Sequence, residues 1–356
     1  MDLSGIVRLS NHYGKDPELV LAGGGNTSVK DEETVFVKCS GTFLATIGED
    51  GFVPASRAAL AETMTKDYPA DNTGREAAFL SDVMAARVIP GDTRRPSVEA
   101  LLHSLFPRKY VVHLHPALVN GLTCGKDGEA KVKALFGDKA AWVPVADPGY
   151  MLGKLCHDVM LAYKEQMGKD VSLVFLENHG VFVAGDTEEE VAELLEGTME
   201  TLRAAVTCFP DEATEAADPA LVEAIKEKTG ANYVKFRTSP QILEFLQSED
   251  AVSALMVPFI PDQVVYCGAE PVYVKDVRDL KSDLQKNRVI LVKNVGMFTI
   301  GQTEKEAELA ALLFLDAIKI AIYGKSFGGA KPLSADMLHF IVNWEAESYR
   351  QKEAQK

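Results

Sequence analysis

Residues 173–189 read LVFLENHGVFVAGDTEE, and this stretch decides the fold class of the 356-residue chain. An apolar run at 173–176 leads into a polar turn with His179 and Gly180, then into a second apolar run and an acidic segment that starts at Thr187. Short apolar runs bounded by turn residues are typical of strands, and Thr before a group of acids is typical of a helix start. The stretch therefore predicts strand, tight turn, strand and helix.

Segments on the N-terminal side repeat the same two kinds of element. Two β-like runs come first, one ending in the glycine-rich turn at 23–26 and the other reading TVFVK at 34–38. Apolar residues then recur at helical spacing within 56–68 and 75–86, and Pro96 opens a further helix. Alternating strands and helices predict a mixed α/β fold.

The overall composition limits the kinds of partner and compartment. With 37 Lys and Arg against 52 Asp and Glu, the net charge is −15, so the surface should repel nucleic acid and anionic membrane. The five cysteines are odd in number, widely spaced and free of a CxxC pair, as expected of reduced thiols. No secretory signal or membrane span is recognisable, so we expect a cytoplasmic protein.

The chain is longer than one ordinary domain needs, and its best boundary candidate lies at 208–232. This segment begins CFPDEATEAADPA, which is acidic, contains two prolines and has little apolar content. We therefore expect a catalytic domain at 1–210, a linker at 211–232 and a second lobe at 233–356.

The second lobe contains an echo of the opening stretch. Residues 294–304, NVGMFTIGQTE, match 178–188, NHGVFVAGDTE, at a constant offset of 116 residues with Asn, Gly, Phe, Gly, Thr and Glu in place. The agreement favours a smaller, degenerate repeat, and an unrelated helical extension is the alternative. Val295 replaces His179, and no histidine lies between His179 and His339. The second lobe is therefore expected to bind no metal.

His113 and His115 are candidate metal ligands because they lie two residues apart in an extended apolar run. Both imidazoles then project from the same face of a strand, and His179 at the tight turn supplies a third. Three neutral imidazoles suit zinc, with manganese, cobalt or iron also possible. Taken alone, the pair is equally well read as two polar residues on a half-exposed strand. The other histidines are expected at surface, capping or supporting positions: His12, His103, His157 and His339.

Glu99 lies early in the helix that Pro96 opens, where the helix dipole favours a carboxylate. Local sequence alone favours a simple helix-start acid. Glu99 and His103 are four residues apart and share one helix face, which can bring both beside the metal site. There, Glu99 is a candidate general base.

Two glycine-containing turns are candidates for anion binding. Residues 22–30 read AGGGNTSVK, and residues 38–42 read KCSGT. Backbone N–H groups and hydroxyls in such concave turns can hold a phosphate. A glycine-rich hairpin turn has the same composition, and neither segment matches the P-loop pattern or the GxGxxG dinucleotide fingerprint.

Five segments together resemble the class II aldolase and adducin family: GGGNTS, KCSGT, RPSVEALLH, VVHLHP and LENHGVFVAG, in the family's order over about residues 1–205. The resemblance implies a three-layer αβα sandwich with a largely antiparallel central sheet, assembled as a homo-oligomer. It implies zinc on His113, His115 and His179, with Glu99 as the catalytic base or acid. It also implies that the substrate phosphate contacts Gly25, Asn26, Ser28, Ser40, Gly41 and Thr42.

The sequence departs from the family pattern in three respects. The family's basic unit is much shorter than this chain, and Val98 stands where its phosphate site often has a second serine. The tyrosine that some family aldolases contribute across an interface has no clear counterpart, and Tyr150 is a guess by position. The stretch WVPVADPGY at 142–150 resembles the rhamnulose-phosphate aldolase part of aldolase–dehydrogenase fusions, although we expect no dehydrogenase within these residues.

The combined expectation is a metal-dependent aldolase that cleaves a ketose 1-phosphate to dihydroxyacetone phosphate and an aldehyde. An epimerase, decarboxylase or dehydratase of sugar phosphates on the same scaffold remains open. A non-catalytic, adducin-like binding module is a further alternative, and the intact histidine segments weigh against it.

Overall fold

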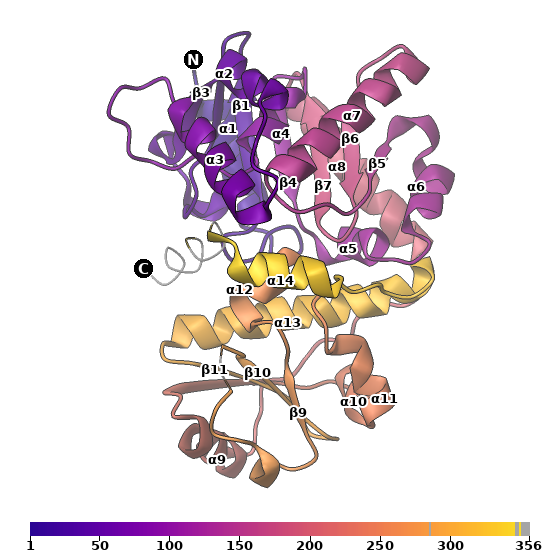
Figure 1. Cartoon of the computed structure of the whole chain (residues 1–356). Helices are drawn as coiled ribbons and strands as arrows, with labels where there is room; N and C mark the ends of the chain where they lie inside the picture. The colour runs from indigo at the N-terminus through magenta and orange to yellow at the C-terminus, as the bar shows by residue number, and fades with distance from the viewer. Residues whose placement is uncertain (285, 346–348, 350–356) are drawn as a thin grey trace. The chain divides into compact units, whose positions relative to one another are not determined.

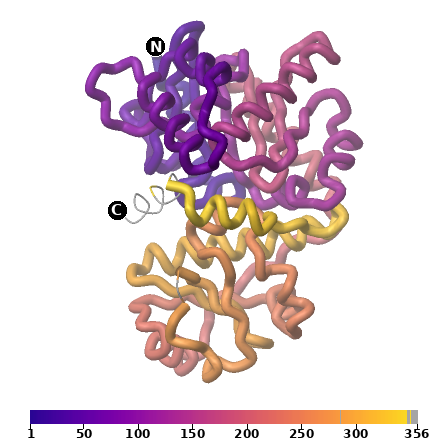
Figure 2. Tube along the Cα trace, in the orientation of Figure 1, coloured from indigo at the N-terminus to yellow at the C-terminus, as the bar shows by residue number. Residues whose placement is uncertain are grey.

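The structure is a computed structural model that describes residues 1–284, 286–345 and 349. In it the chain consists of two compact units. The first unit comprises Met1–Thr123 and Asp127–Ala205, and the second comprises Cys124–Lys126 and the described residues from Val206 onward (Figure 2). Among the described helices, none combines the length and the apolar character that crossing a membrane requires.

A seven-stranded sheet forms the centre of the first unit (Figure 1). Every neighbouring pair is antiparallel except β5 and β6, which run parallel. The expected sheet is confirmed as largely antiparallel, with one parallel pair at its edge. The strands lie in the order β3 (Phe52–Ser56), β2 (Thr34–Lys38), β1 (Asn26–Lys30), β4 (Tyr110–Leu114), β7 (Gly180–Gly185), β6 (Leu173–Leu176) and β5 (Ala141–Val143).

Helices cover both faces of this sheet. They are α1 (Ser4–Gly14), α2 (Arg57–Glu62), α3 (Asn72–Ala85), α4 (Ala100–Leu105), α5 (Ala117–Thr123), α6 (Gly128–Phe136), α7 (Tyr150–Met167) and α8 (Glu188–Ala205). On one face, Leu102 of α4 and Cys156 of α7 pack with Phe182 of β7. On the other face, Ser10 of α1 bonds Thr27 of β1 at 2.7 Å, and α1 in turn contacts α8. This layering confirms the three-layer αβα sandwich.

A four-stranded sheet forms the centre of the second unit, in the order β8 (Tyr233–Arg237), β11 (Gly296–Gly301), β10 (Val289–Val292) and β9 (Val272–Val274). The first two neighbouring pairs are antiparallel, and β10 and β9 run parallel. The sheet rules out the alternative that this region is an all-helical extension.

Helices also lie on both faces of the smaller sheet (Figure 1). They are α9 (Pro219–Thr229), α10 (Pro240–Leu246), α11 (Glu249–Val252), α12 (Pro261–Cys267), α13 (Glu304–Gly324) and α14 (Ala335–Asn343). Ile225 of α9 packs in one hydrophobic cluster with Phe298 of β11. The neighbouring residue Thr299 faces the other way and donates to the carbonyl of Ala307 in α13 at 2.7 Å. Successive side chains of β11 therefore contact opposite helical layers.

Three sequence-based predictions of elements need correction. The β-like run that leads into the turn at 23–26 is not a strand, because the chain turns there, with Ala22 at a φ of 53°, and β1 begins only at Asn26. The helix after Pro96 begins at Ala100, because the chain first forms a turn. Part of the predicted linker at 211–232 is folded, since α9 buries Ile225 in the core of the second unit.

Candidate metal centre

Three histidine side chains converge at one end of β4. The Nε2 atom of His113 lies 2.8 Å from Nε2 of His115 and 3.4 Å from Nε2 of His179. One ligand atom from each residue lies within 4.8 Å of the others. His179 reaches this place because it belongs to the tight turn between β6 and β7, and β7 pairs directly with β4. The structure thus brings together the three histidines that the sequence singled out.

The ring of His113 is held in the orientation that a metal ligand requires. Its Nδ1 donates to the carbonyl of Val181 at 3.0 Å, which leaves Nε2 as the lone-pair nitrogen facing the cluster. The ring stacks on Phe182 with centroids 4.1 Å apart and planes inclined by 17°. Burial holds the pKa of His113 well below its usual value, so the imidazole is neutral, as metal binding requires.

Glu99 turns one carboxylate oxygen toward the same point. Its Oε1 lies 3.3 Å from Nε2 of His113 and 3.5 Å from Nε2 of His179. Its Oε2 accepts a hydrogen bond from Asn26 Nδ2 at 2.6 Å. Burial would raise the pKa of Glu99, but the imidazoles of His113 and His179 and the bond from Asn26 lower it to about 2. Glu99 is therefore an anion at neutral pH.

The donor set fits a divalent cation. Glu99 Oε1 is a buried carboxylate oxygen to which the described residues donate no hydrogen bond. A buried anion without a partner is costly, and a cation held by three imidazoles beside it would remove that cost. Three imidazole nitrogens beside a carboxylate oxygen such as Glu99 Oε1 suit zinc and related transition metals. His113, His115 and His179 are the residues that could hold such an ion.

The residues around Glu99 fix its position. Glu99 is the N-cap residue of α4, and its backbone N–H donates to Ser97 Oγ at 3.2 Å. The N–H of His103 donates to the carbonyl of Glu99 at 3.0 Å, so the two side chains project from one helix face, as their spacing predicted. Asn26 pairs with His113 across β1 and β4, which brings its amide within reach of that face.

The two predicted anion-binding turns are tied to Glu99 or to the segment that precedes it. Gly25 and Gly41 have φ values of 66° and 90°, the left-handed region that glycine adopts at little cost. Ser40 Oγ donates to the carbonyl of Pro96 at 3.2 Å, which ties the KCSGT turn to the segment just before Glu99. Thr42 Oγ1 donates back to the carbonyl of Cys39 at 2.8 Å. Gly25 and Asn26 belong to the other turn, at the point where β1 begins.

Ser28 and Tyr150 have surroundings that differ from those expected of residues facing a substrate. Ser28 is fully buried, and its hydroxyl bonds Nδ1 of His103 at 2.7 Å. Tyr150 packs its ring against Tyr68 and Phe79, with centroids 4.7 and 5.6 Å away, in a hydrophobic cluster. Ser28 thus supports the site from beneath, and Tyr150 is a core residue of the first unit.

His103 is the residue whose place the sequence did not specify. It is fully buried and bonds both Ser28 and Asn26. A signal was present only in part: Glu99 and His103 are four apart on a predicted helix, but the strand that carries Asn26 and Ser28 was not predicted. Nothing in the sequence indicated that this strand and this helix would face each other.

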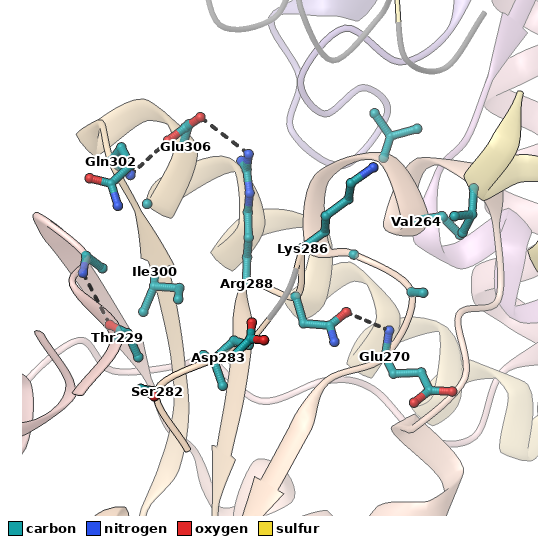
Figure 3. A pocket seen from close by; sticks show the side chains of 18 of the residues that line it. Thr229, Val264, Glu270, Ser282, Asp283, Lys286, Arg288, Ile300, Gln302 and Glu306 are labelled. Atoms are coloured by element: carbon teal, nitrogen blue, oxygen red, sulfur yellow. Dashed lines mark hydrogen bonds and ion pairs between the residues drawn. The ribbon is translucent and has the colours of Figure 1, made fainter. Parts of the chain in front are cut away.

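A cavity of about 1050 Å³ lies in the second unit, near the end of β11 that carries Gly301 (Figure 3). Figure 3 shows Arg288 directed toward Glu306, with which it forms an ion pair of 3.3 Å. The backbone N–H of Glu270 donates to Asn287 Oδ1 at 3.1 Å. No histidine or cysteine occurs among the described residues that line it. Its chemistry therefore differs from that of the histidine cluster.

Comparisons with known proteins agree with the geometry of the first unit. Residues 5–206 match the family model described as Class II Aldolase and Adducin N-terminal domain. The curated relative "Uncharacterized oxidoreductase YuxG" of Bacillus subtilis (strain 168) is 23% identical over an alignment of 411 positions. The match covers 97% of this chain and 57% of that protein, so the chain spans little more than half of the relative's length.

Solved structures are similar to part of the chain. The N-terminal class II aldolase domain of a conserved protein from Thermoplasma acidophilum is 28% identical, with a TM-score of 0.49, covering 57% of this chain and 93% of that chain. An L-fuculose-1-phosphate aldolase from Thermus thermophilus is 14% identical, with a TM-score of 0.37, covering 57% of this chain and 94% of that chain.

Proposed function

The chain belongs to the class II aldolase and adducin family, and from this premise we propose that it is a metal-dependent lyase. Its proposed reaction is the cleavage of a ketose 1-phosphate to dihydroxyacetone phosphate and an aldehyde. One observation carries the proposal: three imidazole nitrogens converge beside a buried carboxylate oxygen that lacks a hydrogen bond. In a cluster with only a structural role, we would expect the buried carboxylate oxygen to accept a hydrogen bond.

In the proposed site, His113, His115 and His179 hold a divalent cation, with zinc favoured and manganese, cobalt or iron as alternatives. When bound, the cation supplies Lewis-acid polarisation of the substrate carbonyl. The hydrogen bond from His113 Nδ1 to the carbonyl of Val181 keeps Nε2 of that ring directed at the cluster, and stacking on Phe182 limits the rotation of the ring. The protein thereby contributes a preorganised ligand set.

Glu99 is the group that moves a proton in this proposal. Cleavage removes the proton of the C4 hydroxyl, breaks the C3–C4 bond with its electron pair remaining on C3, and returns a proton to C3. Glu99 Oε1 is ionised, so it can accept a proton and later donate it. Its second oxygen is engaged by Asn26, so a single oxygen faces the reacting atoms.

The two flanking turns are the proposed phosphate site. Gly25 and Asn26 form one side, and Ser40, Gly41 and Thr42 form the other. Because the chain carries a net charge of −15, an anionic substrate needs local donors. In the second turn Gly41 is the proposed backbone donor, because the N–H groups of Ser40 and Thr42 donate to the carbonyls of Arg95 and Cys39. Binding the phosphate away from the reacting carbons would position them. Ser28 is assigned a supporting role, because its hydroxyl is buried against His103.

Other reactions of sugar phosphates remain alternatives on this scaffold, namely epimerisation, decarboxylation and dehydration. A non-catalytic adducin-like module is less well supported, because the complete histidine triad would serve no purpose in it. We also propose a homo-oligomer, on the basis of family membership.

A screen with a matched mutant tests the proposal. The protein would be incubated with a panel of ketose 1-phosphates, aldehyde release would be measured, and metal content would be determined on the same sample. We expect one ion per chain and cleavage of at least one substrate. Glu99→Gln should keep the metal and lower kcat by about 10²-fold or more. Wild-type protein without metal, or Glu99→Gln with unchanged kcat, would contradict the assignment.

A further inference from the structure

We propose that His103 is a positioning residue that locks the Asn26 carboxamide and so makes Glu99 present one oxygen, Oε1, to the metal centre. The inference rests on the proposed function for its role in turnover. It adds a residue that neither touches the substrate nor binds the metal. Its evidence is an uninterrupted line of hydrogen bonds beneath the site.

The line runs through four buried side chains. Ser28 Oγ lies 2.7 Å from His103 Nδ1, and His103 Nε2 bonds Asn26 Oδ1. Asn26 Nδ2 donates to Glu99 Oε2 at 2.6 Å. Each of the four is at most 8% exposed, so water does not compete for these bonds. The far end of the line is Glu99 Oε1, beside the histidines.

The line has a single consistent direction. Asn26 donates from its NH₂ group to Glu99 Oε2 and so turns its carbonyl to His103. His103 must then carry its proton on Nε2, and Nδ1 must accept from the Ser28 hydroxyl. Burial lowers the pKa of His103 to about 3, so the neutral ring that this arrangement requires is the stable one. Reversing any one bond would place two acceptors or two donors together.

The secondary structure makes this line geometrically stable. Asn26 and Ser28 lie on the same face of β1, and Glu99 and His103 lie one helical turn apart in the α4 region. Lys30, next on that face of β1, donates from Nζ to the carbonyl of His103 at 2.8 Å. The His103 ring also packs edge-on against Phe182, the residue on which His113 stacks. The strand and the helix are thus joined by three polar side chains of β1.

Loss of the donor at His103 Nε2 should free the Asn26 amide. Its buried carbonyl would lose its partner and be left as an unsatisfied polar group, which is unfavourable. The amide can recover a bond only by rotating, and rotation turns its carbonyl toward Glu99 Oε2, where two acceptors repel. Glu99 would then rotate and alter the set of oxygens next to the metal ligands.

Two substitutions separate positioning from packing. Glutamine is one carbon longer than asparagine, so the amide of His103→Gln reaches the place of Nε2, and the amide of His103→Asn reaches only the place of Nδ1. Both remove the ring, and the two side chains differ by one methylene group. His103→Gln should restore the donor to Asn26, and His103→Asn should not.

Cobalt provides a readout that needs no substrate. The visible absorption of Co²⁺ bound to the wild type, His103→Asn and His103→Gln would be compared, together with metal stoichiometry and thermal unfolding. We expect one Co²⁺ in each protein, a changed spectrum in His103→Asn, and a spectrum close to wild type in His103→Gln. Identical spectra for all three proteins would overturn the positioning role, and a wild type that binds no Co²⁺ would overturn the metal site with it.

Turnover supplies the second arm. With a substrate in hand, His103→Asn should lower kcat by about 10²-fold with KM within about threefold of wild type, because the general base is misaligned while the phosphate turns are intact. The kcat of His103→Gln should be at least about tenfold higher than that of His103→Asn. Equal losses in the two variants would indicate a packing role. Thr27→Val is the control, since Thr27 is buried on the opposite face of β1, and it should leave kcat and the spectrum unchanged.

Discussion

The first unit contains a four-strand segment, β4-β7-β6-β5, whose strand order and directions are the same as those of the second sheet, β8-β11-β10-β9. In both, the first two neighbouring pairs are antiparallel and the last pair is parallel. A helix follows the second strand of each set in the chain, α8 after β7 and α13 after β11. Topology alone therefore does not distinguish the two segments.

The agreement extends to the register of the hairpins and to single backbone bonds. Leu176 pairs with Gly180 and Val292 pairs with Gly296, at the offset of 116 residues seen in the sequence. The N–H of His179 donates to the carbonyl of Leu176 at 3.2 Å, and the matching bond at Val295 measures 3.1 Å. We infer that the second unit is a degenerate copy of part of the first.

Two asparagines explain why this turn persists. Asn178 and Asn294 have φ values of 54° and 55°, a left-handed conformation that asparagine tolerates better than most residues. The turn therefore keeps Asn whether or not the next residue is a metal ligand.

The side chains of the two segments differ where chemistry would occur. His113 lies opposite Phe182, whereas the matching pair in the second sheet is Phe236 and Phe298, with ring centroids 4.7 Å apart. Val295 stands in the place of His179. A turn and a ladder of backbone bonds hold a fold together with many different side chains, but a metal site needs all of its ligands at once.

The largest expected difference concerns metal. His113→Ala should abolish stoichiometric metal binding and lower turnover by on the order of 10³-fold or more, because two imidazoles hold a divalent ion poorly. Metal content and aldehyde release would be measured together. His157→Ala, which replaces a partly exposed histidine of α7, is the control. Full metal content in His113→Ala would remove the chemical distinction between the two units.

The matching position in the second unit should affect stability instead. Phe236→Ala removes a buried ring from the cluster around Phe298 and should cost about 3–5 kcal/mol, while one ion per chain is retained. Denaturant unfolding and metal analysis of the same variant would test this. Loss of metal without loss of stability would mean that Phe236 serves the site and not the packing of its own sheet.

Acid should affect the two units unequally. The pKa of His103 is lowered by burial from 6.5 to about 3, so the unfolded chain takes up this proton first as the pH falls. The stability that the neutral ring contributes is therefore lost between pH 6.5 and about 3, by up to about 1.4 kcal/mol per pH unit. The single histidine of the second unit, His339, is exposed.

Hydrogen exchange on metal-free protein would test this difference. Peptides from α4 and β1 should lose protection over that pH range more steeply than peptides from β10 and β11. His103→Gln removes the titrating ring and should reduce the slope in the first unit. An unchanged slope would show that His103 does not carry the acid sensitivity.

The smallest expected effect is a shared one. Thr187 Oγ1 accepts from the N–H of Glu190, and Thr303 Oγ1 accepts from the N–H of Glu306, both at 3.2 Å. Thr187→Ala and Thr303→Ala should each destabilise the helix that follows by about 1 kcal/mol. Local hydrogen exchange in α8 and α13 would measure both. A cost confined to one unit would weaken the inference that the two helix starts are copies.

Local patterns in the sequence were sufficient for several features. The spacing of His113 and His115 placed both rings on one face of a strand, because side chains alternate along extended backbone. The turn at Asn178 and the helix start at Thr187 were predictable from residue preferences that act over a few positions. The repeat at 294–304 was visible for the same reason.

Other features depended on contacts between residues far apart in the chain. Residues 211–232 appeared as a linker because their composition is acidic, yet α9 folds there by burying Ile225 in a core formed by later strands. The predicted strand before Asn26 does not form, since the chain turns at Ala22 with a positive φ.

The sequence by itself therefore determined the three ligand candidates and the element types that carry them, because these follow from short-range periodicity and turn chemistry. Only the tertiary structure decided that β1 pairs with β4, so that Asn26 lies opposite His113 and bonds both Glu99 and His103. Strand order is set by the burial of whole faces and by hydrogen bonds between distant segments, which no local window of sequence contains. The role of His103 arises from that pairing.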